Sequence, residues 1–265
     1  MSDTPHSLQL SLVSHTNVGK TTLARTLLGR DIGEVRDAPH VTEFADVFTM
    51  LETPHGETLR LWDTPGFGDS VRLLKRMQQA GNPLGWFMSQ VWDRWRDRPF
   101  WASQQALRHV AERADLVLYL VSAAEQPQAA AYVASEMALL RWVGKPVIVL
   151  LNQLGMPREP ALEQAEVQRW REHLAPFDRV AQVLPLDAFA RCWVQEHVLL
   201  ERIGAVLPSG RQDSWRPEPL LPRQSRRRRP VQDRRGIARR VSPCPGRCLA
   251  RRSGSPVRLG RVRLP

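Results

Sequence analysis

The sequence feature that most restricts the fold is a strand-like run, a polar loop and a helical run in direct succession. SLQLSLVS at 7–14 leads into HTNV, and GKTTLARTLLG at 19–29 has helical character and ends at a glycine. The loop nearly fits the phosphate-binding pattern G-x-x-x-x-G-K-[ST], in which backbone N–H groups surround phosphates at a helix N-terminus. Ser14 stands where the pattern has its first glycine. Because serine can occupy most of the same backbone space, we expect weakened binding at worst, with an ordinary strand–helix turn as the alternative.

The rest of residues 1–208 alternates between strand-like and helical runs. Continuous apolar runs at 114–123 and 145–152 are typical of buried parallel strands, and 179–187 is a weaker third. The runs at 45–53 and 57–64, joined by PHG, predict a hairpin. Helical stretches are expected near 126–143, 159–174 and 189–206. This alternation predicts an α/β three-layer sandwich of the P-loop NTPase kind, with a mainly parallel central sheet and ligands at the carboxyl ends of its strands.

The positive charge of the chain is confined to its C-terminal part. The net charge is +11, but residues 209–265 contain 17 arginines, no lysine and 3 acidic residues, a net of +14. Residues 1–208 therefore carry 21 basic and 24 acidic residues, a net of −3. The segment 209–265 is rich in Arg and Pro and has no sustained periodicity, which predicts disorder. Its abrupt change of composition would also fit a frameshifted or truncated C-terminal region, so we expect no nucleic-acid partner through the run at 226–229.

Cysteine usage and hydropathy point to the cytoplasm. The chain has three cysteines and no secretory signal, which favours a reducing compartment. Cys244 and Cys248 are a single C-x-x-x-C pair with no second pair and no nearby histidine. A structural zinc site needs four ligands, so we expect these two cysteines to bind no zinc. No apolar run approaches the roughly 18–20 residues of a membrane span.

Two segments together predict a nucleotide site with Mg²⁺. Lys20 would reach the β- and γ-phosphates, and Thr21 would give its hydroxyl to Mg²⁺. In LWDTPGFGD at 61–69, Asp63 ends an apolar strand and could hold Mg²⁺ through a water, and the Gly66 N–H could bond the γ-phosphate. A turn at Pro65-Gly66 with a capping aspartate is the alternative. The full loop set expected to bind nucleotide is Ser14, His15, Thr16, Asn17, Val18, Gly19, Lys20, Thr21 and Thr22.

At these motifs the chain resembles the Era/TrmE-like, translation-factor-related GTPases. More closely, residues 14–44 are similar to a bacterial family of GTPase-domain proteins with a loop G-H-T-N-x-G-K-T, a following G-E-V-x-D-x-P segment and a C-terminal extension of unknown function. The matching positions of that second segment are Glu34, Val35, Asp37 and Pro39. The resemblance covers about residues 7–207. It implies a Mg²⁺-dependent GTPase that binds GTP and GDP.

The resemblance also assigns roles outside the two motifs. Thr42 would be the threonine that binds Mg²⁺ and contacts the γ-phosphate only in the triphosphate state; a loop threonine without that role is the alternative. Where the family has N-K-x-D, the chain has Asn152, Gln153, Leu154 and Gly155. Asn152 would contact the guanine ring, and Asn152 and Gln153 are expected to bind nucleotide. The guanine-reading carboxylate is missing at Gly155, so weaker guanine selectivity is expected. The Ala188 N–H could face the guanine oxygen, although Asp187 could instead be a helix N-cap.

Two residues bear on hydrolysis. Phe67 follows DTPG, where many GTPases have a glutamine that orients the attacking water; hydrolysis must therefore be slow or assisted. In TrmE-like GTPases an asparagine at the place of Asn17 helps bind K⁺ beside the phosphates. The resemblance thus implies K⁺ assistance, with Lys20, Thr42 and Asn17 as the catalytic set and a homodimer through the switch regions. The alternative for Asn17 is that it only shapes the turn.

A tryptophan-rich insertion is expected at about 70–105. Phe87, Val91 and Trp95 recur at helical spacing and form one apolar face. Such a face, within Trp86–Trp101, could meet a protein partner or the surface of the inner membrane as a peripheral contact. The alternative is a helical insertion that covers its own domain. The expected function is accordingly a slow GTPase switch, or a nucleotide-binding interaction module with little turnover that works through this segment.

Overall fold

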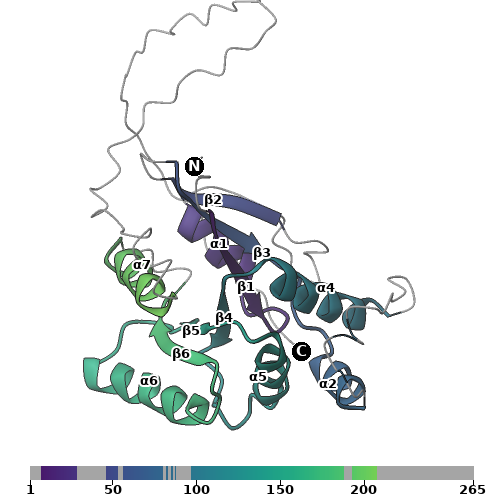
Figure 1. Cartoon of the computed structure of the whole chain (residues 1–265). Coiled ribbons are helices and arrows are strands. Elements are labelled where there is room, and N and C mark those ends of the chain that lie inside the picture. The colour runs from purple at the N-terminus through teal and green to yellow at the C-terminus, as the bar shows by residue number, and fades with distance from the viewer. Residues whose placement is uncertain are drawn as a thin grey trace, which may run out of the picture. The chain divides into compact units, whose positions relative to one another are not determined.

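The computed structural model describes residues 7–28, 46–52, 56–79, 82, 85, 87, 97–187 and 193–207 (Figure 1). The chain divides into two compact units, Met1–Arg223 and Gln224–Pro265, and every described residue belongs to the first. Its elements are β1 (Ser7–Ser14), α1 (Lys20–Leu28), β2 (Asp46–Glu52), β3 (Thr58–Asp63), α2 (Ser70–Gln78), α4 (Arg98–Arg113), β4 (Leu116–Ser122), α5 (Tyr132–Val143), β5 (Val147–Asn152), α6 (Pro160–Leu174), β6 (Val180–Pro185) and α7 (Trp193–Val206).

The six strands form one sheet in the order β2-β3-β1-β4-β5-β6. β1, β3, β4, β5 and β6 pair in parallel, and β2 pairs with β3 in antiparallel fashion. The predicted hairpin and mainly parallel sheet are confirmed. Because β1, β3 and β4 are neighbours, the segments that follow β1 and β3 come out of the sheet side by side, which places the two nucleotide motifs together.

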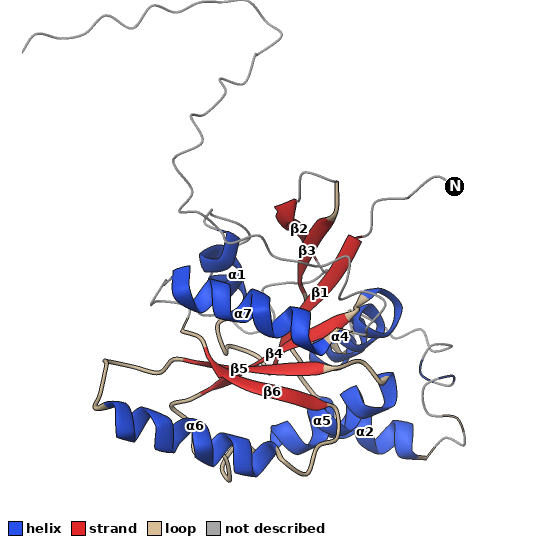
Figure 2. Cartoon of the chain, turned by 60° about the vertical axis from the view of Figure 1, so that its left-hand side comes forward, coloured by secondary structure: helices blue, strands red, loops and turns tan. Residues whose placement is uncertain are grey.

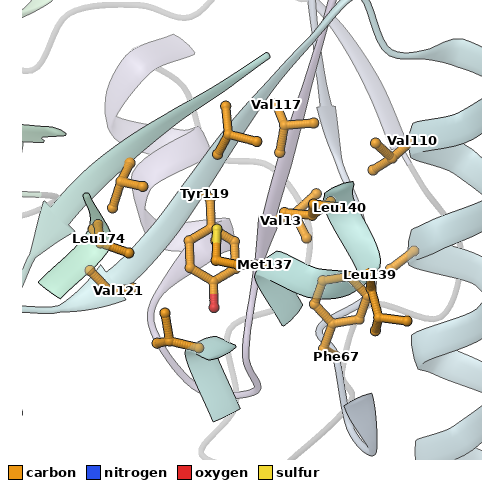
Figure 3. Close-up of a cluster of buried hydrophobic side chains, with 14 of the residues drawn as sticks. Val13, Phe67, Val110, Val117, Tyr119, Val121, Met137, Leu139, Leu140 and Leu174 are labelled. Atoms are coloured by element: carbon orange, nitrogen blue, oxygen red, sulfur yellow. The ribbon is translucent and has the colours of Figure 1, made fainter. Parts of the chain in front are cut away.

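Alternation along the central strands builds two apolar layers. On β4, Leu116, Leu118 and Leu120 join a cluster with α1 and α7, whereas Val117, Tyr119 and Val121 join a cluster with α2, α4, α5 and α6 (Figure 3). Successive strand residues point to opposite faces, so a strand made of apolar residues throughout can only lie between two helical layers. Figure 2 shows α1 and α7 on one side of the sheet and α2, α5 and α6 on the other, which confirms the three-layer sandwich.

Part of the predicted tryptophan-rich insertion is regular structure inside the core. Phe87 and Phe100 are 0% and 1% exposed and belong to the cluster under α2, α4 and α5, and Trp101 is also buried. Trp86, Trp92 and Trp95 lie outside the described residues, as does Val91. The described part of Trp86–Trp101 therefore favours the alternative in which the segment covers its own domain. Trp101 in particular cannot be a surface anchor in this arrangement.

None of the helices in the described ranges is long and apolar enough to cross a membrane.

Candidate nucleotide-binding site

The loop between β1 and α1 has the backbone needed to surround an anion. Asn17 and Gly19 have φ of 64° and 92°, in the left-handed region. Such residues turn successive N–H groups to one side, which makes an anion-binding concavity. A Cβ on Gly19 would lie 2.9 Å from Asn152 Nδ2, so this position requires glycine for both its conformation and its close contact. Ordinary strand–helix turns have no need of such a glycine, and the phosphate-loop prediction gains support over that alternative.

Lys20 lies buried at the first turn of α1, and its ammonium contacts Ser14, which stands where the motif has a glycine. Lys20 Nζ donates to Ser14 Oγ at 3.2 Å, and Ser14 Oγ in turn donates to the carbonyl of His15. Burial lowers the pKa of Lys20, while the carboxylates of Asp63 and Glu136 oppose this shift. Ser14 is thus a hydrogen-bond partner of Lys20, a role that the sequence motif did not predict.

Thr21 and Asp63 meet across the gap between α1 and the end of β3. Thr21 Oγ1 donates to Asp63 Oδ2 at 2.7 Å, and Asp63 Oδ1 is buried without a hydrogen-bond partner among the described residues. Burial raises the pKa of Asp63, opposed by the Lys20 charge and the Thr21 hydrogen bond. A hydroxyl and a carboxylate with an unused buried oxygen are hard oxygen donors, the type that Mg²⁺ takes. These two residues fit a Mg²⁺ ion.

The segment after β3 is fastened to the phosphate loop by its backbone. A Cβ on Gly66 would lie 3.0 Å from Lys20 Nζ and 3.2 Å from Thr16 Cα, so the Gly66 backbone lies beside the lysine. The Phe67 N–H donates to the Ser14 carbonyl at 2.9 Å. The Phe67 ring is 0% exposed and packs in the core (Figure 3). It therefore takes no part in orienting a water molecule, in line with the prediction from its residue type.

The next two backbone N–H groups are held by a residue on α4. Gly68 and Asp69 both donate to Ser103 Oγ, each at 2.9 Å. Arg72 pairs with Asp69 at 2.9 Å and also bonds Asp97, the N-cap residue of α4. The segment after DTPG is thus linked to the start of α4, next to the tryptophan-rich segment. Sequence reasoning missed Ser103, because a single serine inside a helical run carries no signal.

A buried cluster that sequence reasoning also missed packs against His15 of the phosphate loop. His15 Nδ1 lies 2.8 Å from Glu136 Oε1, the His15 ring stacks on Tyr132 with 4.3 Å between centroids, and Tyr119 donates to Glu136 Oε2 at 2.5 Å. Glu136 is fully buried, which raises its pKa, while the hydrogen bond and charge of His15 are the main opposing causes. Its carboxylate favours the charged form of Lys20. The available signal was a glutamate on the core-facing stripe of α5, between Val133 and Leu140.

The end of the site at which base recognition is predicted combines the loops that follow β5 and β6. The Asn152 side chain is buried and its Nδ2 donates to the Val18 carbonyl at 2.8 Å, so it braces the phosphate loop. Gln153 has φ of 58° and its Oε1 accepts from Ser122 Oγ at 2.7 Å. The Leu154 N–H donates to Asp187 Oδ2 at 2.9 Å. α7 begins at Trp193 among the described residues, and residues 188–192 lie outside them, so the alternative of a helix N-cap at Asp187 stays open.

The structure thus brings the loop, Asp63, Gly66 and Asn152 into one site at the carboxyl ends of β1, β3 and β5. Thr42 and Ala188 lie outside the described residues, and their roles stay predictions.

Comparison with known proteins identifies GTPases as relatives of this chain. The model of a family described as 50S ribosome-binding GTPase matches residues 9–153, more than half of the chain. GTPase Era of Heliobacterium modesticaldum is 26% identical over 168 residues, which are 62% of this chain and 46% of that protein. GTPase Der of Deinococcus deserti is 28% identical over 197 residues, which are 68% of this chain and 36% of that protein. The chain thus spans less than half the length of either relative.

Solved structures share the fold. Aquifex aeolicus Era bound to GDP and aluminium fluoride superposes with a TM-score of 0.56 at 18% identity, covering 82% of this chain and 60% of that chain. Era in complex with MgGDPNP and a segment of 16S ribosomal RNA gives 0.55 at 18% identity, with 83% and 61% covered. With the family match over residues 9–153, these findings lead to one assignment: the chain belongs to the 50S ribosome-binding GTPase family and has an Era-like P-loop GTPase fold.

Proposed function

We propose that this chain binds GTP with Mg²⁺ and hydrolyses it slowly, as a cytoplasmic molecular switch. The observation that carries the proposal is the contact between Thr21 and Asp63 beside the buried Lys20, with one Asp63 oxygen left without a partner among the described residues. Burying charges is costly unless a partner compensates them. A triphosphate would add an anionic partner for Lys20, which already donates to Ser14, and a divalent cation would supply the missing partner of Asp63 Oδ1.

Each residue of this group would contribute one step to binding and transfer. The N–H groups of the loop would donate hydrogen bonds to the phosphate oxygens, and Lys20 would neutralise charge on the β- and γ-phosphates. Mg²⁺, when bound, supplies further neutralisation of the same oxygens. The Gly66 N–H, held beside Lys20, would sense the γ-phosphate. Gly68 and Asp69, fastened to Ser103 on α4, would pass a movement of this segment to the start of α4.

Slow turnover follows from the buried Phe67. Its ring lies in the core and the described residues that follow it, Gly68 and Asp69, point their N–H groups at Ser103. A GTPase with a glutamine at this place positions the attacking water with it. This same observation supports a second candidate function, a nucleotide-binding interaction module with little or no hydrolysis.

The test is a comparison of binding with turnover. Purified full-length chain is titrated with fluorescent GTP and ATP analogues, with and without Mg²⁺, and phosphate release from GTP is followed at steady state. GTP binding with measurable release supports the switch, and binding without release supports the interaction module. Absence of binding to either nucleotide would sink both.

Three further proposals concern an ion, a second copy of the domain and a partner or membrane surface. K⁺ would assist hydrolysis through Asn17, two domains would pair through their switch regions, and the tryptophan-rich segment would meet a protein partner or membrane surface. The left-handed φ of 64° at Asn17 supports the alternative in which this residue shapes the turn, since asparagine tolerates that conformation better than most residues. A variant described in the Discussion separates the two.

A further inference from the structure

The loop after β5 lacks the carboxylate that N-K-x-D proteins use to bind guanine. Guanine presents two neighbouring donors, N1–H and N2–H, and an ionised carboxylate, which only accepts, is the side chain that matches both. Gly155 stands where the family has that carboxylate. Its φ is +79°, and a Cβ built there would meet no atom within 4 Å. The loop after β5 therefore has open space at the place of the missing group.

A carboxylate from the neighbouring loop lies against this same segment. β6 runs parallel to β5, and beyond its end the Leu186 N–H still donates to the Leu151 carbonyl at 3.0 Å. This pairing carries the chain past the sheet beside Asn152–Gly155. Asp187 then follows, 7% exposed, with Oδ2 accepting the Leu154 N–H at 2.9 Å. The Asp187 carboxylate is thus fixed to the residue next to Gly155.

We propose that Asp187 provides, from the loop after β6, the carboxylate that the loop after β5 lacks at Gly155, and that it accepts the N1–H and N2–H of guanine. The inference rests on the proposed function, because it needs a guanine nucleotide in the site. A carboxylate offers about four acceptor positions, and Asp187 would keep its existing partners, among them the Leu154 N–H, while it receives the donors of the base. Asp187 is a specificity-determining residue in this arrangement, and the chain keeps guanine selectivity without the usual aspartate.

Replacing Asp187 by asparagine should exchange the preferred base. The amide offers one acceptor and one donor, which matches xanthine, where a carbonyl replaces the N2 amino group. In Asp187→Asn we expect GTP affinity to fall by on the order of 10²-fold and XTP affinity to rise above that for GTP. The asparagine oxygen can still accept the Leu154 N–H. Fluorescent GTP, XTP and ATP are titrated against both proteins, with Asp178→Asn as matched control, since Asp178 precedes the same strand but is 54% exposed and pairs with Arg141.

The outcomes separate this inference from the proposed function. If the unaltered protein binds GTP and ATP equally, or neither, the proposed function fails and the variant is not needed. If the unaltered protein prefers GTP and Asp187→Asn keeps its ratio of GTP to XTP affinity, or loses all nucleotides by one common factor, Asp187 only supports the loop and the inference is wrong.

A measurement on the unaltered chain covers the case in which the variant does not fold. ITP lacks the N2 amino group and keeps every other guanine donor and acceptor. Loss of one hydrogen bond to a carboxylate predicts that ITP binds about tenfold more weakly than GTP. Equal affinity for ITP and GTP would overturn the assignment of Asp187.

Discussion

The phosphate end and the base end of the site are built in different ways. At the phosphate end, Lys20, Thr21 and Asp63 are interlocked and the loop backbone takes left-handed turns at Asn17 and Gly19. The base end depends on side chains of two loops, with Asp187 fixed to Leu154 and no side chain at Gly155. A phosphate is held mainly by backbone groups and compensated charges, so few substitutions are tolerated there. A base is recognised by side-chain hydrogen bonds, which can be supplied from a different loop.

The comparison predicts its largest effect at Lys20. Lys20→Ala should lower affinity for GTP by on the order of 10³-fold or more, because it removes charge-assisted contacts to two phosphates. The fold should persist, since the change also removes a buried charge. Affinity for a fluorescent GTP analogue and thermal unfolding are measured, with the exposed Lys75→Ala on α2 as control. Unchanged affinity would show that the loop does not hold phosphate.

Asp63→Asn should separate stability from binding. We expect Mg²⁺-dependent GTP affinity to fall by about 10–100-fold, as for groups that orient a metal. Burial raises the pKa of Asp63 in the folded state, so its contribution to stability is complete below the unfolded pKa of about 3.9 and is lost as pH rises through the raised value. The nucleotide-free variant should therefore melt at a higher temperature than the parent near neutral pH, with a flatter dependence on pH.

Glu136 contributes a pH dependence of the same sign, because its pKa is also raised by burial, so the slope in Asp63→Asn should be reduced and not abolished. Asp178→Asn, an exposed aspartate, serves as control. If melting temperatures of Asp63→Asn and the parent follow the same curve from pH 4 to 8, Asp63 does not carry the buried charge that the site requires.

A smaller effect is expected from K⁺ at Asn17. Phosphate release in K⁺ should exceed that in Na⁺ at equal ionic strength by on the order of tenfold, well below the ~10³–10⁵ of an arginine finger. Asn17→Gly keeps the left-handed backbone at no steric cost and removes the side-chain ligand. If Asn17 binds the ion, this variant loses the K⁺ effect. If the two salts give equal rates, or Asn17→Gly keeps the difference, the residue only shapes the turn.

Gly155→Asp tests the base end directly. With Asp187 already present, an added carboxylate should raise the preference for GTP over ATP by no more than about tenfold, the value of one net hydrogen bond. Gly144→Asp is a matched control, because Gly144 also has positive φ and open space beside it but caps α5 away from the site. A gain of several orders of magnitude would mean that the carboxylate was absent until then, and would count against Asp187.

The smallest effect is expected from deleting residues 209–265. We propose that residues 1–208 fold and bind nucleotide alone, because the charge and composition change abruptly at Pro208. Neither the affinity for GTP nor the preference for GTP over ATP should change in the shortened chain. Loss of soluble, nucleotide-competent protein would show that these residues contribute to the domain.

More of the phosphate end of the site than of the base end could be predicted from the sequence. The strands, the hairpin and the phosphate motifs were predictable, since apolar runs and a contiguous loop pattern encode them locally. The role of Ser14 as a partner of Lys20 was not, because the motif treats position 14 as a backbone requirement. The contact of Asp187 with Leu154 was not predictable either, since an aspartate after a strand fits several local structures equally well.

By itself the sequence determined that a sheet lies between two layers of helices, because strands that are apolar throughout must be buried on both faces. It also determined the place of the phosphate loop, because the residues of that loop are neighbours in the sequence. Only the tertiary structure decided which distant side chains complete the site. Glu136 meets His15 across 121 positions, Asn152 braces Val18 across 134, and Leu154 holds Asp187 across 33. These contacts depend on which strands lie side by side, and parallel pairing brings together residues that no local pattern relates.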